Sequence, residues 1–416
     1  MRTVQLEPHV HRTDSANGVT LLTESIPGVR SVAVGMWVRT ASAHEHAGVM
    51  GVSHLLEHMV FKGTERRSAR DIALELEVRG GALDAYTSRD HTSYQARVLD
   101  EDLPRALDVL TDLVRNPALR QADLDLERKV VLEEISTVED TPDDLVFDLH
   151  AETLWPQHPY GFSILGTRET VGRMGAEDLR ALHGRTYHPR HVVIAAAGNV
   201  DHDLFVRLVA KCGWFTFEPG PDPRGIAPVP AAVRATRRVT RVGAQTHVVL
   251  GTDTFSYTDR RREALLLINT ILGGGMSSRL FQRVREELGL AYAVYTFQSF
   301  HLATGVTGVY VGTHPSTADD AVDAIRDELR TVASAGLAPD ALAAAKQQLK
   351  GQLTLSLESP ATRMYRLAAF SLHGAPYRTI DQVLADIDAV HADELAAVAA
   401  EYFDPGRQTV VWLGPN

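Results

Sequence analysis

The residues best suited to chemistry form one short run, His54-Leu55-Leu56-Glu57-His58. On a helix, residues four apart lie one turn apart on the same face, so the two imidazoles can bind a single Zn²⁺ ion. Glu57 falls within the same arc of about 100° and therefore points at the same space. The alternative interpretation is a surface helix that carries two solvated histidines.

A second helix is needed, because a catalytic zinc site usually has three protein ligands and one open position for water. The segment of residues 127–135 is the obvious source of the third ligand. Glu127 and Glu134 are seven residues apart, which is two helical turns, so both lie on one face, and Glu133 lies about 100° away. An ordinary charged helix face would give the same pattern.

The elements that must position these residues occur twice along the chain. Residues 189–199 and 405–416 both read as a turn, a buried strand and a glycine stop, with an offset of half the chain. Upstream of each, strands and helices follow in the same order with similar lengths, which indicates a duplicated α+β unit. In the first half we predict strands at 32–38, 82–87 and 92–98 and helices at 51–61, 69–78, 103–115 and 122–139; in the second half, strands at 246–250, 291–297 and 305–312 and helices at 262–272, 278–287, 318–333 and 339–355.

A proline-dense stretch, residues 218–235, separates the halves and predicts a semi-rigid linker. The predicted organisation is therefore a first domain at 1–217, which contains the histidine motif, the linker at 218–235, and a second homologous domain at 236–416. The predicted fold class is α+β, with a mixed sheet in each domain covered by helices on one face.

Together these features resemble the pitrilysin (insulinase) family of zinc metallopeptidases. The carriers are His54-x-x-Glu57-His58, the distant Glu134 with Glu127 seven residues before it, and the stretch from Gly80 to Ser88. The similarity extends to the short bacterial members and to the β subunit of mitochondrial processing peptidase. It implies one Zn²⁺ per chain, with His54, His58 and Glu134 as ligands, Glu57 as general base and Glu127 as a nearby acid that orients a ligand histidine.

The resemblance also implies how substrate is bound. The strand at 82–87 is expected at a sheet edge, where a peptide substrate adds as a further strand against Ala82, Leu83, Asp84 and Ala85. The family usually has Asn where this chain has Asp84, and a carboxylate there changes the charge beside the metal.

The second half lacks a His-x-x-Glu-His run, but it carries Arg285 and, seven residues later, Tyr292. The resemblance gives this pair the task of binding the substrate backbone and stabilising the tetrahedral oxyanion. Without the resemblance, a helix ion pair for Arg285 and a packed strand residue for Tyr292 are the favoured explanations. The glycines at 273–275 lack the ending of a phosphate loop and are a weak signal.

Because the zinc motif and the Arg285–Tyr292 pair are in one chain, the resemblance implies a homodimer in which each chain forms half of a clamshell chamber; a heterodimer with a related chain is the other possibility. The implied function is a zinc endopeptidase for peptides or unfolded segments, including the processing of specific proteins. The alternative is a non-catalytic assembly or core subunit on the same fold, which would not need the four motif residues.

Composition limits the partners. The net charge of −11 argues against nucleic acid and anionic membranes as the main partners. Cys212 is the single cysteine, which excludes an intramolecular disulfide and a multi-cysteine zinc site. The first residues include Glu7 and His9 and show no apolar stretch of signal-peptide length, and no apolar run approaches a bilayer span. We therefore expect a soluble, cytoplasmic protein.

Overall fold

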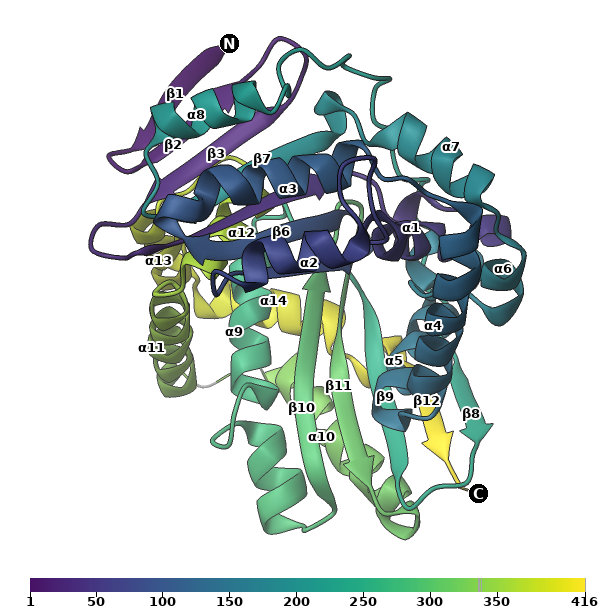
Figure 1. Ribbon diagram of the computed structural model, residues 1–416. Helices are drawn as coiled ribbons and strands as arrows, with labels where there is room; N and C mark the ends of the chain where they lie inside the picture. The colour runs from purple at the N-terminus through teal and green to yellow at the C-terminus, as the bar shows by residue number, and fades with distance from the viewer. Residues whose placement is uncertain (336, 338, 416) are drawn as a thin grey trace. The chain divides into compact units, whose positions relative to one another are not determined.

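The computed structural model describes residues 1–335, 337 and 339–415, and its chain forms two compact units (Figure 1). Unit 1 comprises residues 1–135, 163–227 and 356–377, and unit 2 comprises residues 136–162, 228–355 and 378–416. Asn416, the last residue of the predicted second domain, lies outside the described residues. The main boundary, between residues 227 and 228, falls inside the predicted linker.

Unit 1 contains a seven-stranded mixed sheet in the order β1-β2-β3-β7-β4-β6-β5. β3 and β7 pair in parallel and the other neighbours pair antiparallel, so β5 is an edge strand. The strands are β1 Arg2–Glu7, β2 Val10–Asp14, β3 Thr20–Ser25, β4 Ser31–Val38, β5 Ala82–Thr87, β6 Thr92–Leu99 and β7 Val192–Gly198.

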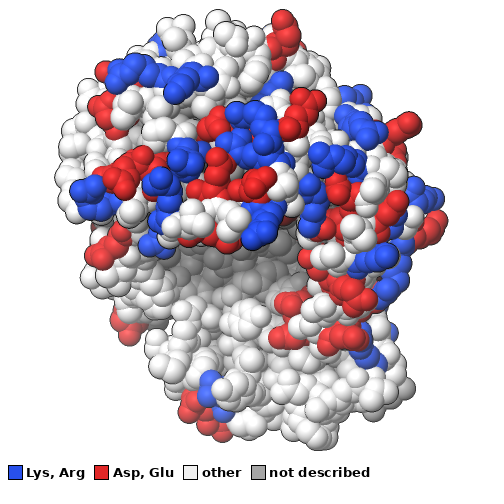
Figure 2. All heavy atoms as spheres, viewed as in Figure 1, with Lys and Arg blue, Asp and Glu red and all other residues white. Residues whose placement is uncertain are grey.

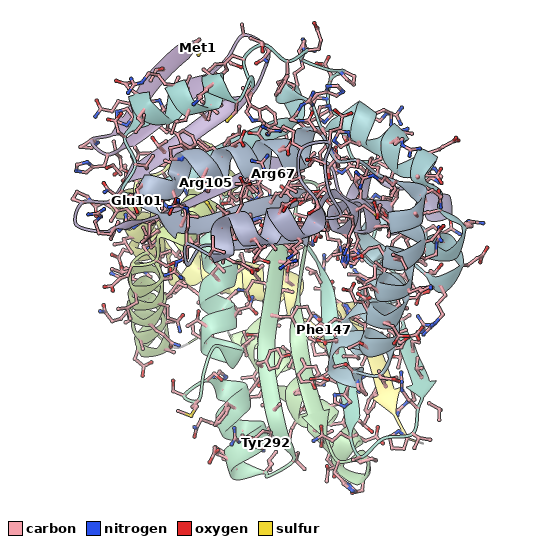
Figure 3. The ribbon with its side chains drawn as sticks, viewed as in Figure 1. Met1, Arg67, Glu101, Arg105, Phe147 and Tyr292 are labelled. Atoms are coloured by element: carbon pink, nitrogen blue, oxygen red, sulfur yellow. The ribbon has the colours of Figure 1, made fainter. Side chains whose placement is uncertain are left out.

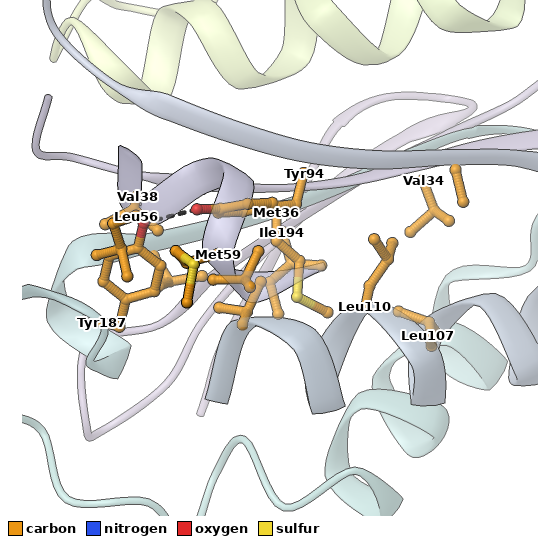
Figure 4. Close-up of a cluster of buried hydrophobic side chains, with 14 of the residues drawn as sticks. Val34, Met36, Val38, Leu56, Met59, Tyr94, Leu107, Leu110, Tyr187 and Ile194 are labelled. Carbon is orange, nitrogen blue, oxygen red and sulfur yellow. Dashed lines mark hydrogen bonds between the residues drawn. The ribbon is translucent and has the colours of Figure 1, made fainter. Parts of the chain in front are cut away.

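Helices cover both faces of this sheet over its central strands. Along β4, Val34 and Met36 belong to a core shared with helices α1 and α3, which Figure 4 shows, whereas Trp37 on the opposite face packs against α12. This strand reads as a continuous apolar run because both of its faces are buried. The helices of this unit are α1 Val52–Val60, α2 Ala69–Glu77, α3 Leu103–Arg115, α4 Gln121–Glu139 (whose last turn belongs to unit 2), α6 Arg168–Arg173, α7 Ala176–Thr186, α8 His202–Lys211 and α12 Pro360–Leu372.

Unit 2 repeats the plan with a five-stranded mixed sheet in the order β10-β11-β9-β12-β8, in which β8 and β12 are parallel. Its strands are β8 Thr236–Thr240, β9 Thr246–Thr254, β10 Ala291–Phe300, β11 Gly305–Thr313 and β12 Thr409–Gly414. Its helices are α5 Pro142–Leu154, α9 Arg262–Gly273, α10 Ala318–Ala335, α11 Pro339–Ser356, α13 Ile380–Ala389 and α14 Ala392–Tyr402, together with a π-helix at Phe281–Glu287.

The predicted fold class is confirmed, since each unit is a mixed sheet covered by helices. The expectation of helices on one face only is wrong, because each sheet also has a helix on its second face. α12 packs on β3, β4 and β7 in unit 1, and α5 packs on β9 and β12 in unit 2. Each of these two helices comes from the half of the sequence opposite to its sheet, so the compact units differ from the contiguous division at 217 and 236.

On the part of the chain that the structure describes, the helices are too short or too polar to cross a bilayer. Within unit 1, charged side chains of both signs alternate over α2 and α3, as Figure 2 shows. Arg67 ties the two helices together through Glu75, Asp108 and Asp112, and Figure 3 places it at the same surface as Arg105.

The attachment of α12 to the unit 1 sheet can be tested at a buried ion pair. Glu24 on β3 is only 4% exposed and pairs with Arg363 of α12, while the nearest nitrogen of Arg366 is 4.0 Å away. We expect Arg363→Met to lower the free energy of unfolding by about 2–3 kcal/mol, because the buried carboxylate loses its close partner. The exposed pair Arg173–Glu169 provides the control, with an expected loss of under about 0.5 kcal/mol for Arg173→Met. Equal losses in urea unfolding would contradict this account.

Candidate metal centre

A glycine and a buried carboxylate fix the start of helix α1, which carries the histidine motif. Gly51 precedes it with φ +89°, a conformation that favours glycine, and a Cβ there would meet the carbonyl oxygen of Leu165 at 2.5 Å. The buried carboxylate of Glu45 accepts hydrogen bonds from the backbone N–H groups of Gly51 and Ser53, both at 2.8 Å. These donors have no partner within the helix, so Glu45 fixes where α1 starts.

The other side of α1 holds the helix in place. Leu55, Leu56, Met59 and Val60 are fully buried in the unit 1 core, and Figure 4 shows Leu56 and Met59 among the strand residues and Tyr187. At 100° per residue, burial of this side leaves the polar side of the helix, with the two histidines and Glu57, facing away from the aliphatic core.

Helix α4 brings the two glutamates to the same place. Leu124, Val131 and Ile135 are buried and anchor one side of α4 in the core. Glu127 and Glu134 lie two turns apart beside α1, where Glu127 is buried and the Glu134 side chain is 40% exposed. Glu133 is exposed.

Three potential metal ligands meet between α1 and α4. One ligand atom from each of His54, His58 and Glu134 lies within 4.8 Å of the other two. The Glu134 Oε2 atom is 3.7 Å from His54 Nε2 and 3.5 Å from His58 Nε2. A tetrahedral zinc ion bound at 2.0–2.1 Å separates its ligands by about 3.4 Å, so this donor set fits zinc in chemistry and in spacing.

The two histidines differ in their support. His58 Nδ1 lies 2.9 Å from Glu127 Oε1, and the other oxygen of Glu127 lies 2.5 Å from the ammonium nitrogen of Lys62. His54 Nδ1 is buried without a hydrogen-bond partner in the described part of the chain. Burial and the nearby His58 lower the pKa of His54 to about 3, so its imidazole is neutral near pH 7 and can act as a ligand.

Glu57 lies beside the three potential ligands but is not one of them. It is 8% exposed, and its Oε2 accepts a hydrogen bond of 2.7 Å from the Thr87 hydroxyl at the end of β5. Burial raises the pKa of Glu57, although the Thr87 hydrogen bond opposes the shift. A carboxylate with a raised pKa next to a metal site is well suited to accept a proton and release it again.

The predicted substrate strand is β5, whose outer backbone edge pairs with no other strand among the residues that the structure describes. Leu83 and Ala85 pack against the core, whereas Ala82 and Asp84 are exposed on the opposite face. Asp84 accepts hydrogen bonds from its neighbour's backbone N–H at 2.9 Å and from Gln95 Nε2 at 3.3 Å. The strand therefore offers a free edge with one exposed carboxylate.

Arg285 and Tyr292 belong to unit 2. The Arg285 guanidinium carbon lies 4.8 Å from the centre of the Tyr292 ring, and the ring itself is 76% exposed at the start of β10 (Figure 3). The structure thus places these two residues against each other on the surface of their unit.

Sequence reasoning assigned no role to Glu45, Lys62 or Thr87, although Thr87 lies in the stretch from Gly80 to Ser88 that carries the resemblance. Glu45 accepts hydrogen bonds from the start of α1, and Thr87 donates one to Glu57 on that helix. Lys62 forms an ion pair with Glu127 of α4. A helix-capping residue is usually sought directly before the helix. Glu45 stands six residues before Gly51, so the sequence did not identify it as the cap of α1. Lys62 and Thr87 lack a local signal, because their partners come from other elements.

Comparisons with known proteins identify the family of this chain. Residues 20–168 match the family model described as Insulinase (Peptidase family M16), and residues 173–349 match the one described as Peptidase M16 inactive domain. An uncharacterized zinc protease of Streptomyces coelicolor is 41% identical, covering 98% of this chain and 90% of the relative. The uncharacterized zinc protease YmxG of Bacillus subtilis is 38% identical over 95% of this chain and 96% of its own length.

Solved structures share the fold. A protease from Helicobacter pylori superimposes with a TM-score of 0.90 at 21% identity, covering 98% of this chain and 100% of that chain. A structure titled as a peptidase M16 inactive domain from Pseudomonas fluorescens gives a TM-score of 0.92 at 20% identity, covering 98% of both chains. Fold, site and relatives together define a zinc metallopeptidase. The chain belongs to the insulinase family of peptidases, family M16, which confirms the resemblance drawn from the motif.

The cap of α1 predicts a pH dependence of stability. Burial raises the pKa of Glu45 from 4.5 to about 7. Between these values the folded protein keeps a proton that the unfolded chain releases, so this carboxyl makes stability fall as pH rises through that window. We expect Glu45→Gln to remove this part of the slope in urea unfolding of metal-free protein from pH 4.5 to 8. Parallel slopes for wild type and variant would show that Glu45 does not titrate in this way.

Proposed function

We propose that this protein is a zinc-dependent endopeptidase that hydrolyses peptides or unfolded polypeptide segments, with one zinc ion per chain held by His54, His58 and Glu134. The observation that carries the proposal is the meeting of these three donors beside Glu57, a buried carboxylate that is not part of the ligand set. Two neutral imidazoles and one carboxylate match the donor chemistry of catalytic zinc sites. The half-exposed Glu134 leaves one side of the site open to substrate.

The positions of Glu57 and Glu127 in the site suggest their roles in the proposed reaction. Zinc bound there supplies Lewis acidity and lowers the pKa of the attacking water. Glu57, held by Thr87, takes the proton from that water and later passes it to the leaving amine. Glu127 accepts the Nδ1–H of His58 and so keeps Nε2 of that ring directed at the metal.

The substrate is proposed to bind as an extended strand along β5. The free backbone edge at Ala82, Leu83, Asp84 and Ala85 supports this, because strand addition uses main-chain hydrogen bonds and tolerates many side chains. We assign Arg285 and Tyr292 to binding the substrate backbone and stabilising the oxyanion. A guanidinium and a phenol are fixed donors suited to developing negative charge.

The proposed assembly is a homodimer that encloses its substrate in a chamber, in which the zinc motif of one subunit works with Arg285 and Tyr292 of the other. Support comes from sequence: both sets of residues stand in one chain, and the second region matches a domain described as inactive. The proposed location is the cytoplasm, since the chain has one cysteine and so needs no oxidising compartment for an internal disulfide.

Replacement of Glu57 tests the chemistry. Glu57→Gln keeps the shape of the side chain and removes the base, so we expect bound zinc to stay at one per chain while peptide hydrolysis falls by about 10²-fold or more. Metal analysis and cleavage of a mixed peptide library, with and without a chelator, measure both quantities. Glu77→Gln, on the exposed end of α2, is the control. Near-normal turnover by Glu57→Gln would refute the assignment.

Mixing two inactive variants tests the shared site. In a dimer of Glu57→Gln with Arg285→Ala, one of the two sites pairs an intact zinc motif with an intact Arg285. Random mixing at equal concentrations makes half of the dimers mixed, so we expect activity to return to about a quarter of the wild-type value. A solution mass of one chain, or no recovery after subunit exchange, would contradict the shared dimeric site.

A further inference from the structure

Lys62 stands just after the end of α1, at one end of a short chain of polar contacts. Its Nζ atom lies 2.5 Å from Glu127 Oε2, and Glu127 Oε1 lies 2.9 Å from His58 Nδ1. One carboxylate therefore joins an ammonium group to a ring that faces the metal site. The histidine motif, the distant glutamates and the proposed reaction leave Lys62 without a role.

The burial of Glu127 explains why a cation is needed there. Its side chain is 7% exposed, and a buried carboxylate without a counter-charge is costly. An imidazole that offers Nε2 to a metal is neutral and can donate only the N–H at Nδ1. The permanent positive charge beside Glu127 is therefore supplied by Lys62.

The same contacts fix the direction of the His58 ring. Because both oxygens of Glu127 have a partner, rotation of the carboxylate breaks one contact or the other. His54 has no such support, since its Nδ1 lacks a partner among the residues described. Of the two proposed histidine ligands, only His58 is therefore held at its Nδ1 atom, by the carboxylate of Glu127.

We propose that Lys62 is a positioning residue of the metal site, which acts through Glu127 to hold His58 in the orientation that binds zinc. The inference rests on the proposed function for the identity of the ligands. It goes beyond that function because it assigns a purpose to a lysine that touches neither metal nor substrate.

An ordinary surface ion pair is the competing explanation, and the chain offers a matched control for it. Lys129 lies two residues from Glu127 on the same helix, but it is exposed and forms no ion pair within the described residues. Removing Lys129 changes the charge near the site by the same amount without touching the carboxylate. An effect of general charge would be equal for the two lysines.

The test is the affinity of the full-length protein for zinc, measured by competition with a chelator. We expect Lys62→Met to bind zinc about tenfold more weakly than wild type, as is typical when support behind a metal ligand is removed. Lys62→Arg, which keeps a cation, should recover most of the affinity, and Lys129→Met should match wild type. Circular dichroism of the metal-free variants verifies that each one is folded.

A double variant tests whether Lys62 acts through Glu127. If it does, Lys62→Met causes little further loss of zinc affinity in a Glu127→Gln background, so the two losses are not additive. Additive losses, or a Lys62→Met affinity equal to that of wild type, overturn the inference alone. Wild-type protein that binds no zinc overturns the proposed function as well, so the two failures are distinguishable.

Discussion

The candidate metal site depends on how helix α1 accommodates three polar side chains that are buried or largely buried. His54 and Glu57 are almost fully buried, and His58 is largely so. Burial of such groups is favourable only when each one finds a partner. His58 has Glu127 as its partner and Glu57 has Thr87, whereas Nδ1 of His54 lacks a partner among the described residues. The Nε2 atoms of both histidines lie near Glu134 Oε2. These contacts hold His58 and Glu57 in place and leave the two Nε2 atoms available to the proposed metal.

Local pattern accounts for the parts that the sequence could predict. Apolar spacing identifies α1, α3 and α4 nearly to the residue, because each has an apolar side that is buried in the unit 1 core. The seven-residue interval between Glu127 and Glu134 places both on one face of α4 whatever that helix packs against. The need for a third ligand pointed to this helix, but the choice of Glu134 as that ligand came from the family resemblance and not from the residues themselves.

Features that depend on tertiary contacts left no such trace. α5 and α12 are ordinary amphipathic helices, and nothing in their own residues states which sheet each one covers. Their exchange between the two halves is visible only from their packing on β9 and β12, and on β3, β4 and β7. Lys62 could not be predicted either, because a lysine after a helix is common. Its role depends on the ion pair with the buried carboxylate of Glu127, which only the structure shows.

Because the fold is duplicated, comparison of the two units shows which features of α1 the fold itself does not require. α9 is the counterpart of α1 in unit 2, and it buries Leu265, Leu267 and Ile268 with no histidine motif. Its buried Glu263 and Asn269 have protein partners, Arg378 at 2.9 Å and Thr307 at 3.1 Å. Helices therefore cover the unit 2 sheet, and the described residues of this unit hold no cluster of potential metal ligands. By the same logic, the buried donors of α1 are not required to form the unit 1 fold, and their desolvation cost is consistent with a site kept for catalysis.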